Sequence, residues 1–192
     1  KANEGEKDPF YRLNRAFGQM IQQVNESSKV VIAITEGAVM GGGFGLACVS
    51  DVAIAGPTAK FGMPETTLGI LPAQIAPFVV ERIGLTQARR LALLGLRIGA
   101  EEACALGIVH QIASSDVELE DMLAHTVERV RNCAPTATAQ TKALLHRVGH
   151  ESMSGLLDSA AEMFAAAVKG SEGNEGTMAF MQKRPPAWAD TK

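Results

Sequence analysis

A run of three glycines, 41–43, constrains this chain more than any other feature of its sequence. The run follows residues 30–34, a short β-branched apolar stretch typical of a strand buried on both faces. It precedes residues 44–49, which have the character of a helix. A junction of this kind presents bare backbone N–H groups at a helix N-terminus, where no Cβ blocks an approaching ligand. The run therefore indicates a site for a phosphate or a developing oxyanion, with tight backbone packing as the alternative.

The spacing around these glycines excludes two nucleotide-binding loops. The sequence has neither a G-x-G-x-x-G pattern with a later ribose-binding acid nor a G-x-x-x-x-G-K-[ST] pattern. Its 18 Lys and Arg residues against 21 Asp and Glu residues give a net charge of −3, which disfavours a nucleic-acid partner. No apolar run approaches the roughly 20 residues that cross a bilayer, so no membrane partner is expected.

The spacing of cysteines and histidines argues against a metal site. Cys48, Cys104 and Cys133 are odd in number and too widely spaced for a disulfide framework or a CxxC knuckle. We interpret them as small buried hydrophobes in a reducing compartment, which we expect to be the cytoplasm. His146 and His150 are four residues apart but lack the acid of an H-E-x-x-H helix. We therefore predict no metal ligands.

The hydrophobic pattern predicts an α/β core followed by helices only. A helix is expected within 9–28, strands at 51–55 and 108–112, and a brief extended piece at 60–62. Glycine stops separate three helices after Pro72, expected at 75–83, 86–94 and 100–106. Four later helices are expected at 117–132, 136–148, 151–169 and 174–182. We therefore predict a core domain over residues 1–115 and a helical region over residues 116–192.

Glu65 is the second candidate for chemistry. It follows Pro64 within an otherwise apolar stretch, 61–72. Partial desolvation of a carboxyl group at such a place suits it to proton transfer near neutral pH. An exposed turn residue without a catalytic role is the alternative.

The order of these motifs resembles the enoyl-CoA hydratase/isomerase (crotonase) superfamily. The resemblance runs through G-A-V-M-G-G-G-F-G-L-A, S-D-V-A-I-A, F-G-M-P-E-T-T-L-G-I-L-P and R-I-G-L-T-Q-A-R-R-L-A-L-L-G, and it ends in E-G-T-M-A-F-M-Q-K-R-P-P-A-W. It covers essentially the whole chain in order. It implies a spiral core of ββα units that carries the active site, and a helical C-terminal region that builds homotrimers, often paired into hexamers.

The resemblance also assigns roles to single residues. Gly42 matches the residue whose N–H forms half of an oxyanion hole for a thioester carbonyl, and Glu65 matches the acid/base glutamate. Hydratases with two glutamates carry the second acid where this chain has Gly45, so hydration by paired carboxylates is not expected. The first strands, and the loop that gives the other oxyanion N–H and lines the adenine pocket, are expected to precede Lys1.

One branch of the superfamily shares the pattern around Gly45. Hydratases of methylglutaconyl-CoA and isohexenylglutaconyl-CoA resemble this chain in G-G-G-x-G-L with one later glutamate, and in the segment L-P-A-Q-I-A-P-F-V-V. This resemblance implies a branched or carboxylated acyl chain. A physical reason for Gly45 would be that such an acyl tail needs the space that a second glutamate would fill.

Further residues are candidates for binding the substrate. Gln74 and Phe78 are spaced to share one helix face and to line an acyl pocket, with packing as the alternative. The resemblance implies that Phe180 and Lys183 approach the CoA of a neighbouring subunit. Four more candidates lie within the two motifs: Gly41, Gly45, Met63 and Pro64.

We therefore predict an acyl-CoA hydro-lyase that adds water to an α,β double bond. CoA enters as part of the substrate, and no other cofactor is expected. A double-bond isomerase that uses the same Glu65, and a non-catalytic homologue, are the alternatives. Arg82, Arg89 and Arg90 are expected on a solvated face, with contact to a CoA phosphate as their alternative.

Overall fold

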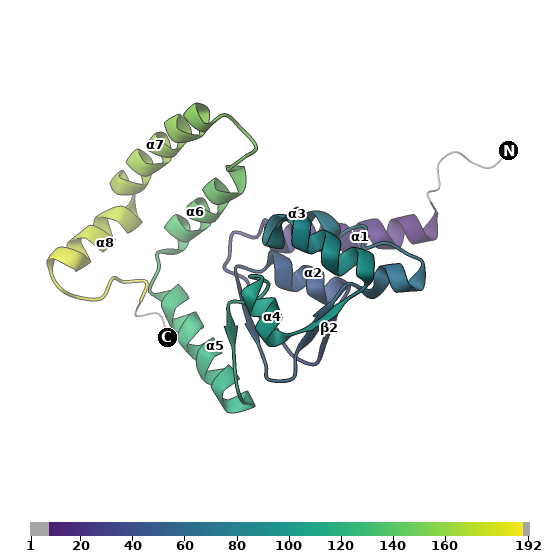
Figure 1. Cartoon of the computed structure of the whole chain (residues 1–192). Helices are drawn as coiled ribbons and strands as arrows, with labels where there is room; N and C mark the ends of the chain where they lie inside the picture. Colours follow the sequence, from purple (N-terminus) through teal and green to yellow (C-terminus); the bar gives the residue numbers. More distant parts are fainter. Residues whose placement is uncertain (1–7, 190–192) are drawn as a thin grey trace. The chain divides into compact units, whose positions relative to one another are not determined.

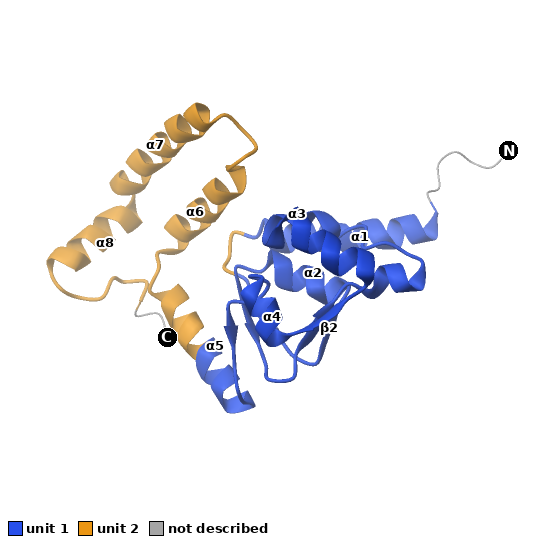
Figure 2. Cartoon of the chain, viewed as in Figure 1, with its two compact units in different colours: residues 1–27, 31–123 blue, residues 28–30, 124–192 orange. Residues whose placement is uncertain are grey.

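A computed structural model describes residues 8–189 of the chain. By its own contacts the chain divides into two compact units, which Figure 2 shows in different colours. Unit 1 comprises the described residues up to Ser27 together with Val31–Leu123, and unit 2 comprises Ser28–Val30 and the described residues from Ala124 onward. The domain boundary expected after residue 115 stays a prediction.

Unit 1 contains two small sheets. The first has the order β1 (Ile32–Thr35), β3 (Val52–Ala55), β6 (Gln111–Ile112), and both pairs are parallel. The second has the order β2 (Ala38–Met40), β4 (Lys60–Gly62), β5 (Arg97–Gly99), with a parallel pair β2–β4 and an antiparallel pair β4–β5. Strands alternating with helices confirm the expected α/β class.

Three helices of unit 1 pack together around the glycine run. Helices α1 (Pro9–Asn25) and α3 (Ala76–Leu94) both contact α2 (Gly42–Val49), and a short helix α4 (Ala100–Ala105) packs on β5 (Figure 1). The Asp8 carboxylate caps α1 by accepting hydrogen bonds from the N–H groups of Phe10 and Tyr11. The core beneath these helices includes the fully buried side chains of Ile21, Phe44 and Phe61.

From Asp116 onward the described residues form helices and no strands, as the pattern predicted. Helix α5 (Asp116–Arg131) leads into α6 (Pro135–Arg147), α7 (Met153–Lys169) and α8 (Ser171–Met181). The Ser152 side chain caps α7 by accepting a hydrogen bond from the N–H of Gly155. Within residues 8–189, no helix is both long and apolar enough to span a membrane.

The structure corrects several local expectations. Strands β2 and β5 and a 3-10 helix, η1 (Pro64–Leu68), were not expected, and the two helices expected at 75–83 and 86–94 form one element, α3, kinked at Gly84 with φ +73°. Strand β1 is half-buried up to its last residue, Thr35, in the part of the chain that the structure describes, so the expected full burial on both faces is not seen there. Cys48 is buried as expected, whereas Cys133 is exposed.

Candidate active site

Strands β2 and β4 bring the glycine run and Glu65 to one edge of their sheet. The strands are parallel and Met40 pairs with Gly62, so the residues that follow each strand leave the sheet side by side. The N–H of Gly41 donates to the carbonyl oxygen of Gly62 over 3.0 Å. A Cβ on Gly41 would lie 3.1 Å from Glu65 Oε1. The structure therefore places the two motifs that the sequence singled out in direct contact.

The Glu65 carboxyl group has an incomplete set of partners. Glu65 stands in η1 and is half-buried, so it is not an exposed turn residue. Its Oε2 atom is buried and has no hydrogen-bond partner among the residues that the structure describes. An unpaired buried oxygen of this kind costs free energy, which a hydrogen-bond donor from a bound ligand would recover.

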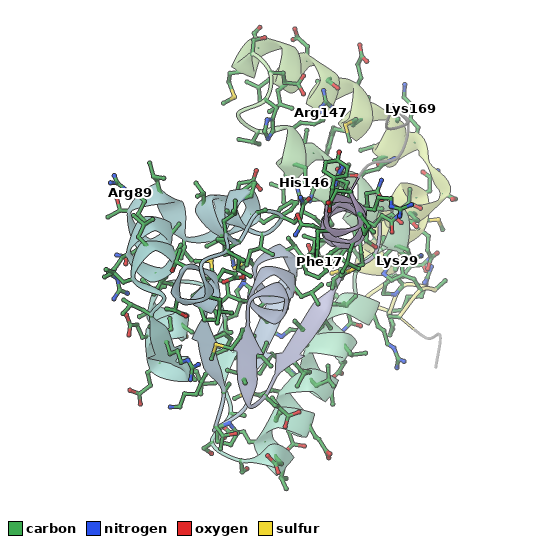
Figure 3. All side chains as sticks on the ribbon, turned by 90° about the vertical axis from the view of Figure 1, so that its right-hand side faces the viewer. Phe17, Lys29, Arg89, His146, Arg147 and Lys169 are labelled. Atoms are coloured by element: carbon green, nitrogen blue, oxygen red, sulfur yellow. The ribbon has the colours of Figure 1, made fainter. Side chains whose placement is uncertain are left out.

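The three glycines of the run differ in what they permit. Gly41 has φ +51°, in the left-handed region that side-chain-bearing residues avoid. Gly42 is the first residue of α2, where backbone N–H groups have no partner within the helix, and a Cβ there would meet Phe17 Cζ at 2.7 Å. Gly43 is exposed, and a Cβ there would meet only Val39 Cγ1, at 3.9 Å. Position 42 is therefore the one covered by an aromatic ring, Phe17 of α1, which Figure 3 labels.

Gly45 faces packed side chains. A Cβ on Gly45 would lie 2.3 Å from Ile75 Cγ2 and 3.2 Å from Ile21 Cδ1. The expectation that Gly45 leaves space for an acyl tail was therefore wrong, because Ile75 fills that space. The same contact leaves no room for a second carboxylate, which agrees with a site built on Glu65 alone.

The remaining expected site residues of unit 1 lie around this centre in different environments. Met63 is 1% exposed and belongs to the core, and Pro64 is half-buried. Gln74 is half-buried and donates from Nε2 to Asn14 Oδ1 of α1 over 2.9 Å. Phe78 is also half-buried and packs against the core cluster.

Two expected site residues belong to unit 2. Phe180 of α8 is 85% exposed, and Lys183 is exposed with φ +53° just beyond the helix. Their suggested approach to CoA stays a prediction.

Arg82 has a structural role that the sequence did not reveal. Its guanidinium donates to the carbonyl oxygens of Gly107 (2.7 Å), Ser50 (3.2 Å) and Ile108 (3.2 Å). These bonds join the end of α2 to the segment after α4, so the expectation of a solvated or phosphate-binding Arg82 was wrong. Arg89 and Arg90 are both exposed as expected, and Arg90 also forms an ion pair with Glu102.

Two titratable groups lie beside Arg82. Burial raises the pKa of the Cys48 thiol to about 12, which makes it unreactive near neutral pH. His110 accepts a hydrogen bond at Nδ1 from the N–H of Ala53, and burial together with the Arg82 charge lowers its pKa. Among residues 8–189, no group of three or more His, Cys, Asp or Glu side chains is placed to hold a metal ion.

Comparison with known proteins assigns the fold and the family. The sequence model described as Enoyl-CoA hydratase/isomerase matches residues 2–191. The 2,3-dehydroadipyl-CoA hydratase of Escherichia coli (strain K12) is 32% identical over 182 residues, which cover 94% of this chain and 71% of that protein.

Two solved structures are more similar still. An enoyl-CoA hydratase/isomerase from Marinobacter aquaeolei is 82% identical with a TM-score of 0.95, covering 99% of this chain and 72% of that one. Pseudomonas aeruginosa AtuE is 55% identical with a TM-score of 0.94, covering 98% and 73%. The similarity confirms the crotonase-like α/β fold with a helical C-terminal region. The chain belongs to the enoyl-CoA hydratase/isomerase family.

Proposed function

We propose that this chain carries the active site of an enoyl-CoA hydratase, which adds water across the α,β double bond of an acyl-CoA thioester. One observation carries the proposal: a buried, unpartnered oxygen of Glu65 lies in the same site as the N-terminal residues of α2. The family supports it, as does the name of the Escherichia coli relative, a hydratase of an enoyl-CoA.

The proposed chemistry uses the Gly42 N–H, which is half of the oxyanion hole, and one acid/base group. The N–H of Gly42 would polarise the thioester carbonyl and hold the negative charge that develops on its oxygen. Glu65 would take a proton from water as the hydroxyl group adds to Cβ, and would then return that proton to Cα. One carboxylate completes this cycle, because the proton that it removes is the proton that it delivers.

The proposed substrate carries a branched or carboxylated acyl chain, as the resemblance around Gly45 implies. CoA would enter as part of this substrate, with no further cofactor. A homotrimer or a dimer of trimers is the proposed assembly, in which Phe180 and Lys183 would approach the CoA bound by a neighbouring subunit.

Glu65→Gln tests the proposal. The substitution keeps the shape of the side chain and removes its proton transfer, so hydration should fall by about 10²- to 10⁴-fold. The rate is measured as the loss of ultraviolet absorbance when water adds to the conjugated thioester. Glu81→Gln, at an exposed position of α3, is the matched control and should keep the parent rate.

Product analysis separates the two reactions that Glu65 could perform. A hydrated product has the mass of the substrate plus one water, whereas an isomer keeps the substrate mass. An isomer as the sole product would replace the hydratase by a double-bond isomerase. Equal rates for the parent and Glu65→Gln would remove Glu65 from the reaction altogether.

A further inference from the structure

An amide pair joins α1 to the segment that precedes α3. Gln74 Nε2 donates to Asn14 Oδ1 over 2.9 Å, and these residues are 60 positions apart in the sequence. After this bond the Asn14 side chain retains its amino group as a donor, whereas the Gln74 carbonyl oxygen lies against Gly18. The pair therefore offers a donor to a further group.

Gly18 provides the space that holds this pair. Gly18 is buried within α1, and a Cβ there would lie 1.8 Å from Gln74 Oε1 and 2.6 Å from Gln74 Cδ. Any larger residue at position 18 would displace the Gln74 amide. The Gln74 side chain thus occupies a slot in the surface of α1.

The pair lies close to the proposed oxyanion donor. Asn14, Phe17, Gly18 and Ile21 follow the i, i+3, i+4, i+7 spacing of one helix face. Phe17 covers Gly42, and Ile21 meets Ile75 over Gly45. Because residues three apart on a helix are neighbours, about 5–6 Å between Cβ atoms, Asn14 is one turn from the ring that covers Gly42.

The same face of α1 continues outward from Asn14 as apolar residues. Phe10 and Leu13 share it and are exposed. An acyl chain that left a thioester at Gly42 and followed α1 would meet Phe17, then the amide pair, then Leu13. The amide pair is thus the polar point on an otherwise apolar path.

We propose that Asn14 and Gln74 select substrates by binding an oxygen-bearing group on the acyl chain, a carboxylate or a hydroxyl. The inference rests on the proposed function for the position of the thioester, and it adds the residues that read the acyl chain. Phe17 forms the wall between the thioester and this group. Gly18 acts by holding Gln74 in place.

The test measures binding, so that it does not depend on catalysis. Saturated thioesters cannot be hydrated, and calorimetry would compare two matched pairs: adipyl-CoA with hexanoyl-CoA, and succinyl-CoA with butyryl-CoA. A third probe, 6-hydroxyhexanoyl-CoA, separates a hydroxyl group from a carboxylate. The parent should prefer the oxygen-bearing member of at least one of these comparisons.

Variants of the pair then identify which side chain binds the oxygen-bearing group of the acyl chain. Gln74→Leu should reduce the preference by about 3- to 10-fold, as expected for one lost hydrogen bond, while binding of the apolar thioester is kept. Gln74→Glu should weaken carboxylates most and tolerate the hydroxyl probe, an asymmetry that a merely structural role would not produce. Gly18→Ala should act like Gln74→Leu because it displaces the amide. Gln23→Leu is the control, because Gln23 is exposed and lies on the opposite side of α1 from Asn14.

The outcomes separate this inference from the proposed function. Normal hydration by the parent, with no preference or with a preference that Gln74→Leu leaves unchanged, overturns the role of the amide pair alone. A preference that Gln74→Leu removes, in a protein that hydrates no enoyl-CoA, overturns the proposed reaction alone. Absence of binding to every thioester overturns both. A fall in far-UV circular dichroism for Gly18→Ala would leave Gln74→Leu and Gln74→Glu as the deciding variants.

Discussion

The two compact units differ in how many apolar side chains they bury. Unit 1 buries its large side chains under the site, where Ile75, Ile21 and Phe44 are covered. Among the described residues of unit 2, only Leu156 and Ala179 are buried hydrophobics, whereas Phe164 of α7 is 71% exposed. Both units also expose large apolar side chains, such as Phe10 and Leu85 in unit 1. Unit 1 therefore differs from unit 2 in its buried core, and self-association through unit 2 stays part of the proposal.

Side-chain hydrogen bonds fix a helix end in unit 2. In unit 2 the Glu172 carboxylate accepts hydrogen bonds from the N–H groups of Thr136 and Ala137, at the start of α6. Beside it, α6, α7 and α8 border an apolar groove of ≈ 340 Å³ that Phe164 lines. This capping fixes the start of α6 and leaves Phe164 exposed beside the groove.

The largest effect is expected within the glycine run of unit 1. Gly42→Ala drives a Cβ into Phe17 Cζ, at 2.7 Å, and displaces either the ring or the N–H that would hold the oxyanion. Loss of one such donor lowers kcat by about 10²- to 10³-fold. Gly43→Ala is the control, because its Cβ makes only an ordinary contact with Val39 Cγ1 at 3.9 Å. Enoyl-CoA hydration rates of the two variants check the difference.

Equal losses in Gly42→Ala and Gly43→Ala would mean that the run matters as a whole and would remove the special role of position 42. In either case the oligomeric state should not change, since both residues belong to unit 1. Light scattering on the same samples checks that point.

The next effect concerns the exposed apolar surface of unit 2. Phe164→Ser should weaken self-association, because burying such a side chain contributes about 1.5–3 kcal/mol. Val117→Ser is the matched control: Val117 is also 71% exposed but lies in unit 1. Size-exclusion chromatography with light scattering, over a dilution series, measures the midpoint of dissociation. A parent chain that is monomeric at every concentration would contradict the proposed assembly. Equal shifts in the midpoint of dissociation for both variants would contradict an interface on unit 2.

A smaller effect is expected where unit 1 is most tightly packed. Gly45→Ala places a methyl group 2.3 Å from Ile75 Cγ2, and overpacking of this kind costs about 1–3 kcal/mol of the free energy of unfolding. Ile75→Ala should recover part of this loss when the two are combined, since the two side chains then no longer compete for one space. Urea denaturation of the four proteins in this cycle measures the coupling. Additive losses would show that Ile75 is not what closes the space beside Gly45.

Sequence patterns could predict the elements whose signal is local. The apolar spacing of α1 and the glycine stop after α3 predicted those helices to within a few residues. Strands β2 and β5 are three residues each, too short for a period to be visible in the sequence. The kink at Gly84 could not be predicted either, because a glycine that ends a helix and a glycine that kinks one give the same signal in the sequence.

The site was predictable in its parts but not in its packing. Gly42 and Glu65 could be selected as candidates because their motifs are contiguous in sequence, and their catalytic roles stay predictions. The contacts Phe17–Gly42, Ile75–Gly45 and Asn14–Gln74 join residues far apart in the chain, and nothing local marks them. The prediction for Arg82 was wrong for the same reason: the three carbonyl groups that accept its hydrogen bonds come from two distant segments.

The smallest expected effect is on the pH dependence of stability, which should differ between the two units. In unit 1, burial and Arg82 lower the pKa of His110 below the ordinary 6.5, so the unfolded chain takes up this proton first. The stability that depends on neutral His110 is therefore present above about pH 6.5 and is lost as the pH falls below it. His110→Gln should flatten this part of the profile. Hydrogen exchange of the β3 amides measures it, since the Ala53 N–H donates to His110.

In unit 2, Arg184 holds the pKa of Glu175 at about 2, below the ordinary 4.5. The stability that depends on the ionised carboxylate is present above pH 4.5 and is lost as the pH falls toward 2. Trp188, the only tryptophan in the sequence, donates to Asn132 within unit 2, so its fluorescence reports this unit. Arg184→Gln should narrow the acid window of the fluorescence profile, because the Ala187 N–H still donates to Glu175, and should leave the window of His110 in place. A single transition that both probes follow at one pH would mean that the two units unfold together, and it would contradict the assignment of the two pH windows to separate units.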